Sequence, residues 1–292
     1  MEQNFGKHLA PFSIDPDTTI GAVTIGVNQL DKMLQFYQRV IGLTILNRAA
    51  TSAELGIEDT PIVILQSRPG AKQYPRSPGL YHMAILLPTR RDLGHWLAHL
   101  VAGQYPLDGA GDHLVSEALY LSDPEGNGIE MYCDRPRESW EYLHNSIKMD
   151  TLPVDLKSLQ AEAPGSEFKG LPKGTTMGHV HLKVDDIHKS TRFYQEVLGF
   201  DLMATWPGAA FLSAGGYHHH IGANMWNSRG AAPLPPESLG LIAYQIVLPT
   251  KEARQELTVR LDALSYPTEK TGIDNFLRDP AGNGILLKIR ES

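Results

Sequence analysis

The feature of this sequence that most restricts its fold is an internal duplication. Four short stretches of the first half recur in the second half, at 21–24 and 178–181, 36–42 and 193–199, 87–89 and 248–250, and 123–129 and 279–285. The copies lie 156 to 161 residues apart. Self-similarity at a nearly constant spacing indicates that one structural unit has been repeated. We therefore expect two similar halves whose loops differ slightly in length.

Each half contains two units with the same order of elements. In the first unit, β-branched residues 20–27 predict a strand, apolar residues at helical spacing in 31–40 predict a helix, and 62–65 predict a closing strand. The second unit has a strand at 81–87, a helix at 91–101 and a hairpin of 116–122 with 128–133. Units three and four repeat this order at 178–226 and 241–289.

The predicted architecture is therefore an α+β fold of four βαβββ units with curled mixed sheets. No strand leads into a glycine-rich phosphate loop, which argues against a doubly wound sheet. We place the first domain at 1–150 and the second at 177–292. Residues 151–176 form a linker rich in Pro, Gly and acidic residues, with a short helical patch at 155–162.

The composition excludes several classes of function. A net charge of −7 argues against nucleic acid or an anionic membrane as the main partner. The single cysteine, Cys133, excludes an intramolecular disulfide and a multi-cysteine zinc site. The chain shows neither a signal-peptide pattern at its N-terminus nor an apolar run of about 20 residues. We expect a cytoplasmic protein, and the sequence leaves open whether it forms a homo-oligomer.

Comparison of the copies singles out three polar residues whose counterparts are apolar. His82 corresponds to Ala243, Glu130 to Leu286, and His179 to Ala22. Two histidines and one carboxylate form the facial triad of non-haem Fe(II) sites, which leaves coordination positions open for substrate and dioxygen. We therefore predict a metal site at these three residues. His181 lies on the same strand face as His179 and is the alternative ligand, although Ala84 occupies its place in unit two.

Three motifs carry a resemblance to a known family. They are Gly178-His179, the helix end from Phe193-Tyr194 to Leu198-Gly199, and the run 120–130, in which Tyr120 precedes Glu130 by ten residues. With these motifs the chain resembles the vicinal oxygen chelate (VOC) superfamily, specifically the type I extradiol dioxygenases of the catechol 2,3-dioxygenase kind. The resemblance covers essentially the whole chain and implies two tandem VOC domains that enclose a metal site.

The resemblance implies an activity and further site residues. It implies ring cleavage of catechol or a substituted catechol by dioxygen and Fe(II), with Mn(II) as the alternative metal. The partners would then be a small aromatic diol and dioxygen. The family's acid/base histidine matches His219, with His220 as the alternative register. Tyr120 matches the active-site tyrosine, and His113 lies near the family's pocket histidine.

One departure from the family concerns the order of the units. Family members commonly carry all three ligands in the third and fourth units, whereas here unit two holds His82 and Glu130 and unit three holds His179. We therefore expect the site to form between the inner units, with the outer units paired as a scaffold.

Two other functions fit the same scaffold. One is a glyoxalase-like metal-dependent lyase or isomerase, and the other is a non-catalytic protein that binds a small aromatic compound. The histidines around Tyr120 favour oxygen chemistry over the first alternative, and the complete triad argues against the second.

Overall fold

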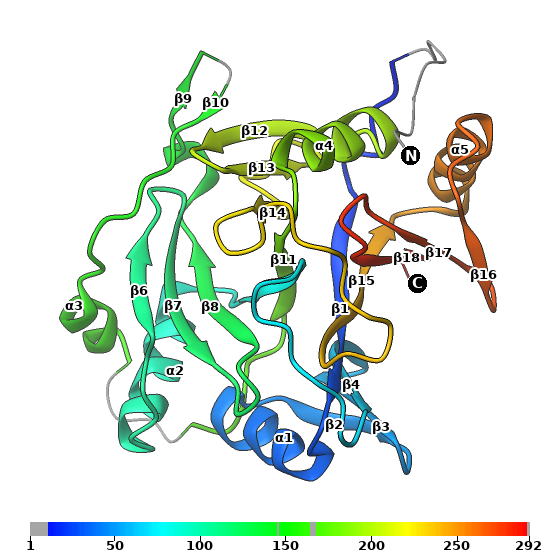
Figure 1. Cartoon of the computed structure of the whole chain (residues 1–292). Helices are drawn as coiled ribbons and strands as arrows, with labels where there is room; N and C mark the ends of the chain where they lie inside the picture. Colours follow the sequence, from blue (N-terminus) through cyan, green and yellow to red (C-terminus); the bar gives the residue numbers. More distant parts are fainter. Residues whose placement is uncertain (1–10, 145, 164–167, 291–292) are drawn as a thin grey trace.

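The computed structural model describes residues 11–144, 146–163 and 168–290, and within them two eight-stranded sheets dominate the fold (Figure 1). The first sheet joins the outer units. In spatial order its strands are β16 (Glu269–Thr271), β17 (Asp274–Arg278), β18 (Gly284–Ile289), β15 (Gly240–Leu248), β1 (Thr19–Val27), β4 (Thr60–Ser67), β3 (Ser52–Ile57) and β2 (Thr44–Arg48). Its two central strands, β1 and β15, are antiparallel and come from opposite ends of the chain.

The second sheet joins the inner units. Its strands are, in spatial order, β12 (Asp201–Trp206), β13 (Ala209–Ser213), β14 (Ile221–Asn224), β11 (Thr176–Lys183), β5 (Gly79–Leu86), β8 (Gly128–Asp134), β7 (Ser116–Ser122) and β6 (Gly109–Asp112). The prediction that units two and three pair with each other, and the outer units likewise, is confirmed. The two sheets meet where β1 packs beside β11.

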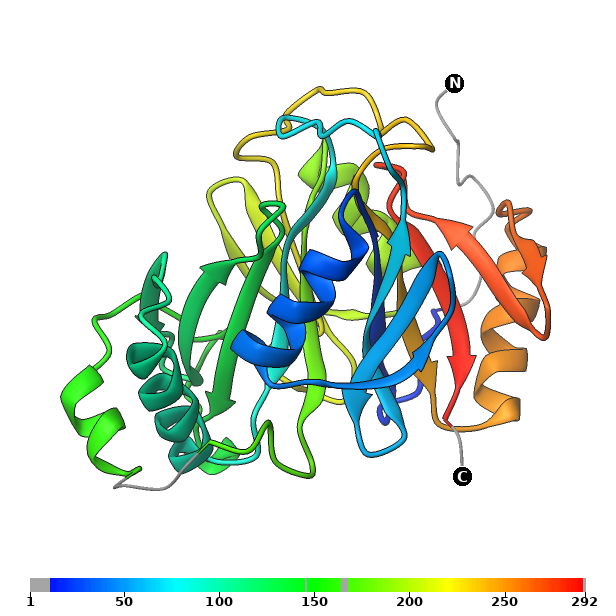
Figure 2. The ribbon, with the colours of Figure 1, turned by 90° about the horizontal axis from the view of Figure 1, so that it is seen from below.

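The helices lie outside the sheets, and Figure 2 shows the two long ones, α2 (Arg90–Ala102) and α5 (Lys251–Ala263), on opposite sides of the molecule. The repeated Leu-Pro-Thr supplies the N-cap of both, because the side chains of Thr89 and Thr250 accept hydrogen bonds from the first turn. The shorter helices are α1 (Leu30–Phe36), α3 (Leu156–Ala161) and α4 (Ile187–Arg192). Among the described residues, no helix combines the length and apolar character needed to cross a membrane.

The expected helix at 31–40 ends differently from a regular α-helix. Both α1 and α4 continue as one turn of π-helix, η1 (Tyr37–Ile41) and η3 (Phe193–Val197). Gly42 then ends the first of them with φ of 96°, a conformation that glycine adopts without a steric penalty. The remaining elements are a 3-10 turn, η2 (Arg137–Ser139), and a small hairpin of β9 (Tyr142–Leu143) and β10 (Ser146–Ile147).

The repeated Asp-Pro-x-Gly-Asn turns connect the two sheets. The Tyr37 hydroxyl, from an outer unit, donates a hydrogen bond of 3.0 Å to Asp123 in an inner unit. The second half repeats this contact between Tyr194 and Asp279, also at 3.0 Å. Each aspartate also accepts backbone hydrogen bonds within its own turn. The residues that the two copies share therefore build the scaffold.

Candidate metal centre

Three adjacent strands of the second sheet carry the three residues that distinguish the copies. His82 lies on β5, Glu130 on β8 and His179 on β11, and β5 is the middle strand. Glu130 and His179 both pair with Ala84 of β5, while His82 lies two residues before Ala84. Alternate residues of a strand share a face, so all three side chains project from the same face of the sheet, around the methyl group of Ala84.

The register of β11 depends on a bulge at Gly178, between Met177 and His179. A Cβ atom at Gly178 would lie 1.8 Å from the Tyr132 hydroxyl oxygen, so only glycine fits there. The bulge brings His179 to the level of Ala84. The glycine of the Gly178-His179 motif is thus required by packing next to the site.

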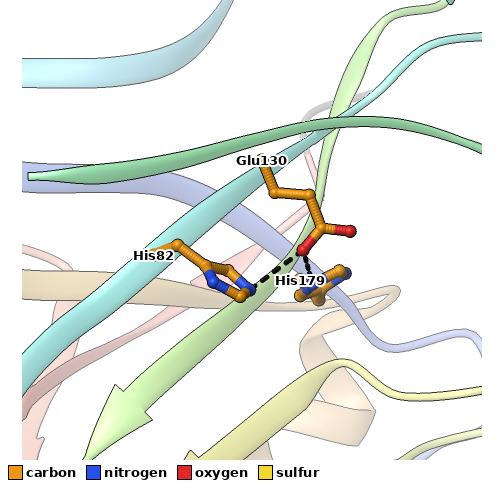
Figure 3. A group of neighbouring side chains, drawn as sticks. All are labelled: His82, Glu130 and His179. Carbon is orange, nitrogen blue, oxygen red and sulfur yellow. Dashed lines mark ion pairs between the residues drawn. The ribbon is translucent and has the colours of Figure 1, made fainter. Parts of the chain in front are cut away.

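The three side chains converge on one point, as Figure 3 shows. Glu130 Oε2 lies 3.0 Å from His82 Nε2 and 3.3 Å from His179 Nε2. One possible ligand atom from each residue can be chosen so that all three lie within 4.8 Å of one another. Metal–ligand bonds of about 2 Å place neighbouring ligand atoms about 3 Å apart. The spacing therefore fits a single divalent cation.

Burial makes this arrangement costly without a cation. The residues are 8%, 3% and 1% exposed in chain order. Glu130 Oε2 lies within 3.3 Å of both Nε2 atoms, but among the described residues His82 Nε2 and both His179 nitrogens have no partner in hydrogen-bond geometry. Buried polar atoms without partners cost about 1–3 kcal/mol each. Unpartnered imidazole nitrogens directed at a buried carboxylate are what a metal centre requires.

The protonation states suit metal binding as well. Burial lowers the pKa of the His179 imidazole to about 4, so this ring is neutral at pH 7 and has a lone pair. Burial alone would raise the pKa of the Glu130 carboxyl, but the adjacent His179 and His82 outweigh it and hold that pKa well below its usual range. A neutral imidazole and an ionised carboxylate are the ligand forms that bind divalent metals.

His181, the alternative ligand, lies beside the cluster. It pairs directly with His82 across β5 and β11, and the two rings are 4.9 Å apart. The convergent set contains His179 and does not include His181, which instead lines the adjoining cavity. A Cβ atom at residue 222 would lie 2.9 Å from His181 Cγ. Gly222 therefore makes room for this ring.

The cavity above the cluster has a volume of about 470 Å³, within the range of small-molecule sites. His82 and Glu130 belong to its wall, together with His113, Tyr120, His181 and His219. Its aromatic wall consists of Tyr81, Trp206, Phe211 and Trp226. No lysine or arginine is among the described residues that line it. The sequence analysis did not identify the aromatic wall, because a strand or loop aromatic carries no local sign of which cavity it faces.

Tyr120 and His113 form a hydrogen-bonded pair on one side of the cavity. Tyr120 pairs with Glu130 across the β7–β8 hairpin, so the spacing of ten residues places the two side by side. Its hydroxyl oxygen lies 2.6 Å from His113 Nε2, while His113 Nδ1 lies 2.9 Å from the carbonyl oxygen of Asp150. Burial, followed by the charge of Glu130, raises the pKa of Tyr120 well above 10, so its phenol stays protonated.

The three consecutive histidines before β14 are all buried, but they lie in different surroundings. His219 lines the cavity, and its ring centroid is 4.0 Å from that of His179. His220 does not line the cavity, because its Nδ1 lies 3.1 Å from Ser213 Oγ and accepts a hydrogen bond from Ala214 N. His218 lies behind His219 and contacts Asp134, a pair that the sequence analysis missed.

Comparison with known proteins gives the class to which this fold and site belong. The family model described as the Glyoxalase/Bleomycin resistance protein/Dioxygenase superfamily matches residues 19–131 and 176–286, and the chain belongs to this superfamily. The chain is also 42% identical over 283 residues to the catechol-2,3-dioxygenase of Bacillus subtilis strain 168. The matched residues cover 95% of this chain and 99% of the relative. This likeness over nearly the whole chain places it among the extradiol dioxygenases of the superfamily, as the motifs indicated.

Two further similarities are more limited. The chain is 32% identical over 159 residues to biphenyl-2,3-diol 1,2-dioxygenase 3 of Rhodococcus globerulus, covering 48% of this chain and 82% of that protein. The solved structure of glyoxalase I from Zea mays matches with a TM-score of 0.56 and 16% identity, covering 93% of this chain and 92% of that one. The second similarity concerns the fold alone.

Proposed function

We propose that this protein is an extradiol ring-cleaving dioxygenase that opens catechol or a substituted catechol with dioxygen. In this proposal His82, Glu130 and His179 hold one Fe(II) ion per chain, with Mn(II) as the alternative metal. The observation that carries the proposal is the convergence of three buried ligand groups beside a cavity of about 470 Å³, two of which, His82 and Glu130, line it.

A divalent metal bound by these three residues would supply Lewis-acid and redox chemistry toward a diol and dioxygen. With one carboxylate and two neutral imidazoles, the ligand set leaves one net positive charge on a divalent ion, which favours an anionic, chelating diol. His219, neutral and beside His179, would take a proton from the diol. Tyr120 and His113 would hydrogen-bond the substrate oxygens from the other side of the cavity.

The experiment that tests the function combines metal analysis with oxygen uptake. Protein purified anaerobically is expected to hold about one Fe(II) per chain and to consume one dioxygen per catechol opened. Mass analysis of the product should show both oxygen atoms retained and the ring opened next to the diol. Binding of catechol by the metal-loaded protein without oxygen uptake would support the binding-protein alternative and contradict the proposal.

The cavity wall also restricts the substituent on the ring. Its aromatic side chains offer apolar surface, and among the described lining residues Glu130 and Asp108 are acidic while none is a lysine or arginine. With the diol at the metal, a carboxylate elsewhere on the ring would find no lysine or arginine among the described lining residues, and burying an unpaired charge costs several kcal/mol. We infer that the preferred catechols carry uncharged, apolar substituents.

This inference predicts a clear substrate preference. The value of kcat/KM for 3-methylcatechol is expected to exceed that for 3,4-dihydroxybenzoate by more than about 100-fold, which corresponds to about 2.8 kcal/mol at about 1.4 kcal/mol per factor of ten. Steady-state oxygen uptake with both compounds measures the ratio. Methyl 3,4-dihydroxybenzoate is the matched control, since it lacks the charge. Equal values for the acid and its methyl ester would refute the charge argument.

A further inference from the structure

A line of hydrogen bonds leads from the cavity to the end of strand β8. His219 Nδ1 lies 2.7 Å from His218 Nδ1, and His218 Nε2 lies 3.0 Å from Asp134 Oδ1. His218 is fully buried, whereas the Asp134 side chain is 28% exposed. A carboxylate near the surface is thus connected through two imidazoles to a ring that lines the cavity.

This order of groups determines where the protons lie. An ionised carboxylate only accepts hydrogen bonds, so a neutral His218 beside Asp134 carries its proton on Nε2 and leaves Nδ1 as an acceptor. The short contact between the two Nδ1 atoms then requires His219 to donate from its own Nδ1. A neutral His219 that is protonated on Nδ1 has its free lone pair on Nε2.

The surroundings hold this arrangement in place. The Tyr217 hydroxyl donates a hydrogen bond of 3.1 Å to the same oxygen of Asp134 and lies 2.8 Å from the Tyr132 hydroxyl. The Trp140 ring packs against His218 with its centroid 5.4 Å from the imidazole centroid. Glu130 and Asp134 lie four residues apart on β8, so the strand that supplies a metal ligand also directs this carboxylate to the same side of the sheet.

We infer that Asp134 and His218 are positioning residues that fix the tautomer of His219, so that its Nε2 offers a lone pair to the substrate. A catalytic base needs that lone pair, because a nitrogen that already carries a proton cannot accept another from the diol. With the opposite tautomer, His219 would present an N–H group and the first proton transfer would stop. The inference rests on the proposed role of His219 as acid/base.

The first test needs no variant and no metal. Nitrogen-15 NMR of histidine-labelled, metal-free protein at pH 7 is expected to show His219 protonated on Nδ1 and His218 protonated on Nε2. Spectra of His218→Gln and His219→Gln assign the signals. A wild-type His219 protonated on Nε2 would overturn the inference, whatever the activity of the enzyme.

The second test uses Asp134→Asn. An asparagine amide group can donate to His218 Nε2, which reverses the order of protons along the line. We expect the NMR signals of His219 to shift toward the Nε2–H tautomer and kcat to fall at least about tenfold, with metal content and KM within about twofold of wild type. General acid–base catalysis contributes about 10²–10⁴-fold to the rate, so the fall in kcat should not exceed that range.

Two controls separate a tautomer effect from a structural one. Asp274→Asn makes the same change at a carboxylate of the other sheet, where Asp274 binds Lys288, and it should leave kcat and the tautomer unchanged. Asp134→Glu keeps the accepting carboxylate and should restore part of kcat. An unchanged tautomer in Asp134→Asn refutes the inference. If the tautomer shifts in Asp134→Asn but the wild-type protein does not cleave catechol, the result refutes the proposed function and not the tautomer assignment.

Discussion

Replacing Glu130 with alanine is expected to empty the metal site and to stop ring cleavage, while the fold remains intact. The carboxylate is the only ligand of the set that carries a negative charge, since imidazole binds a metal as a neutral ligand. Loss of an outer-sphere partner of a metal site typically costs about 10–100-fold in affinity, so the loss of a charged ligand should cost more. Metal content per chain, measured after anaerobic purification and dialysis, reports the effect.

Two variants sharpen this measurement. Glu130→Gln keeps the size of the side chain and removes its charge, so it should also lose most of the metal. Glu141→Ala removes an exposed carboxylate that binds Lys148 and belongs neither to the ligand set nor to the cavity wall, and it should keep full metal content. Circular dichroism and the melting temperature of the metal-free proteins test whether the fold persists. Full occupancy in Glu130→Ala would show that the metal, if present, is held elsewhere.

Replacing His219 with alanine is expected to preserve metal and catechol binding and to slow turnover at least about a hundredfold, the lower end of the contribution of general acid–base catalysis. The reason is that His219 lies on the cavity wall, where burial lowers the pKa of its imidazole. The ring is therefore neutral at pH 7 and can accept a proton. Because its ring packs on that of His179, metal content must be measured in the same samples as kcat.

His220→Ala provides the matched control for His219→Ala. His220 forms its hydrogen bonds with Ser213 and with Ala214 N, outside the cavity. Its removal should lower the stability of the fold by about 1–3 kcal/mol, since it leaves a buried donor without a partner, but should leave turnover per bound metal nearly unchanged. If turnover falls in His220→Ala and persists in His219→Ala, the acid/base histidine has been assigned one residue too early.

Much of the site could be predicted because the duplication supplies an internal comparison. Ala22, Ala243 and Leu286 show what each position contains when only the fold is needed, so the polar residues at 179, 82 and 130 stand out. The pairing of Tyr120 with Glu130 also follows from local pattern, because a tight turn between two alternating strands brings residues ten apart into register. Strand periodicity and turn residues act over short distances, and the sequence displays them directly.

The choice between neighbouring histidines depended on the tertiary structure. Strand alternation puts His179 and His181 on the same face, and only the bulge at Gly178 brings His179 to the level of Ala84. His219 and His220 likewise differ through contacts with distant strands, since one faces the cavity and the other binds Ser213. A register shift of one residue reverses which side chains face inward, and no local pattern records it.

The sequence by itself determined the repeated units, their strands and helices, and the three residues by which the copies differ. The tertiary structure alone decided that Asp134 meets His218, 84 residues later in the chain, and which aromatic side chains enclose the cavity. The physical reason is that local periodicity reflects burial on one face of one element. Contacts between elements arise from packing of the whole sheet, to which every strand contributes and which no single segment specifies.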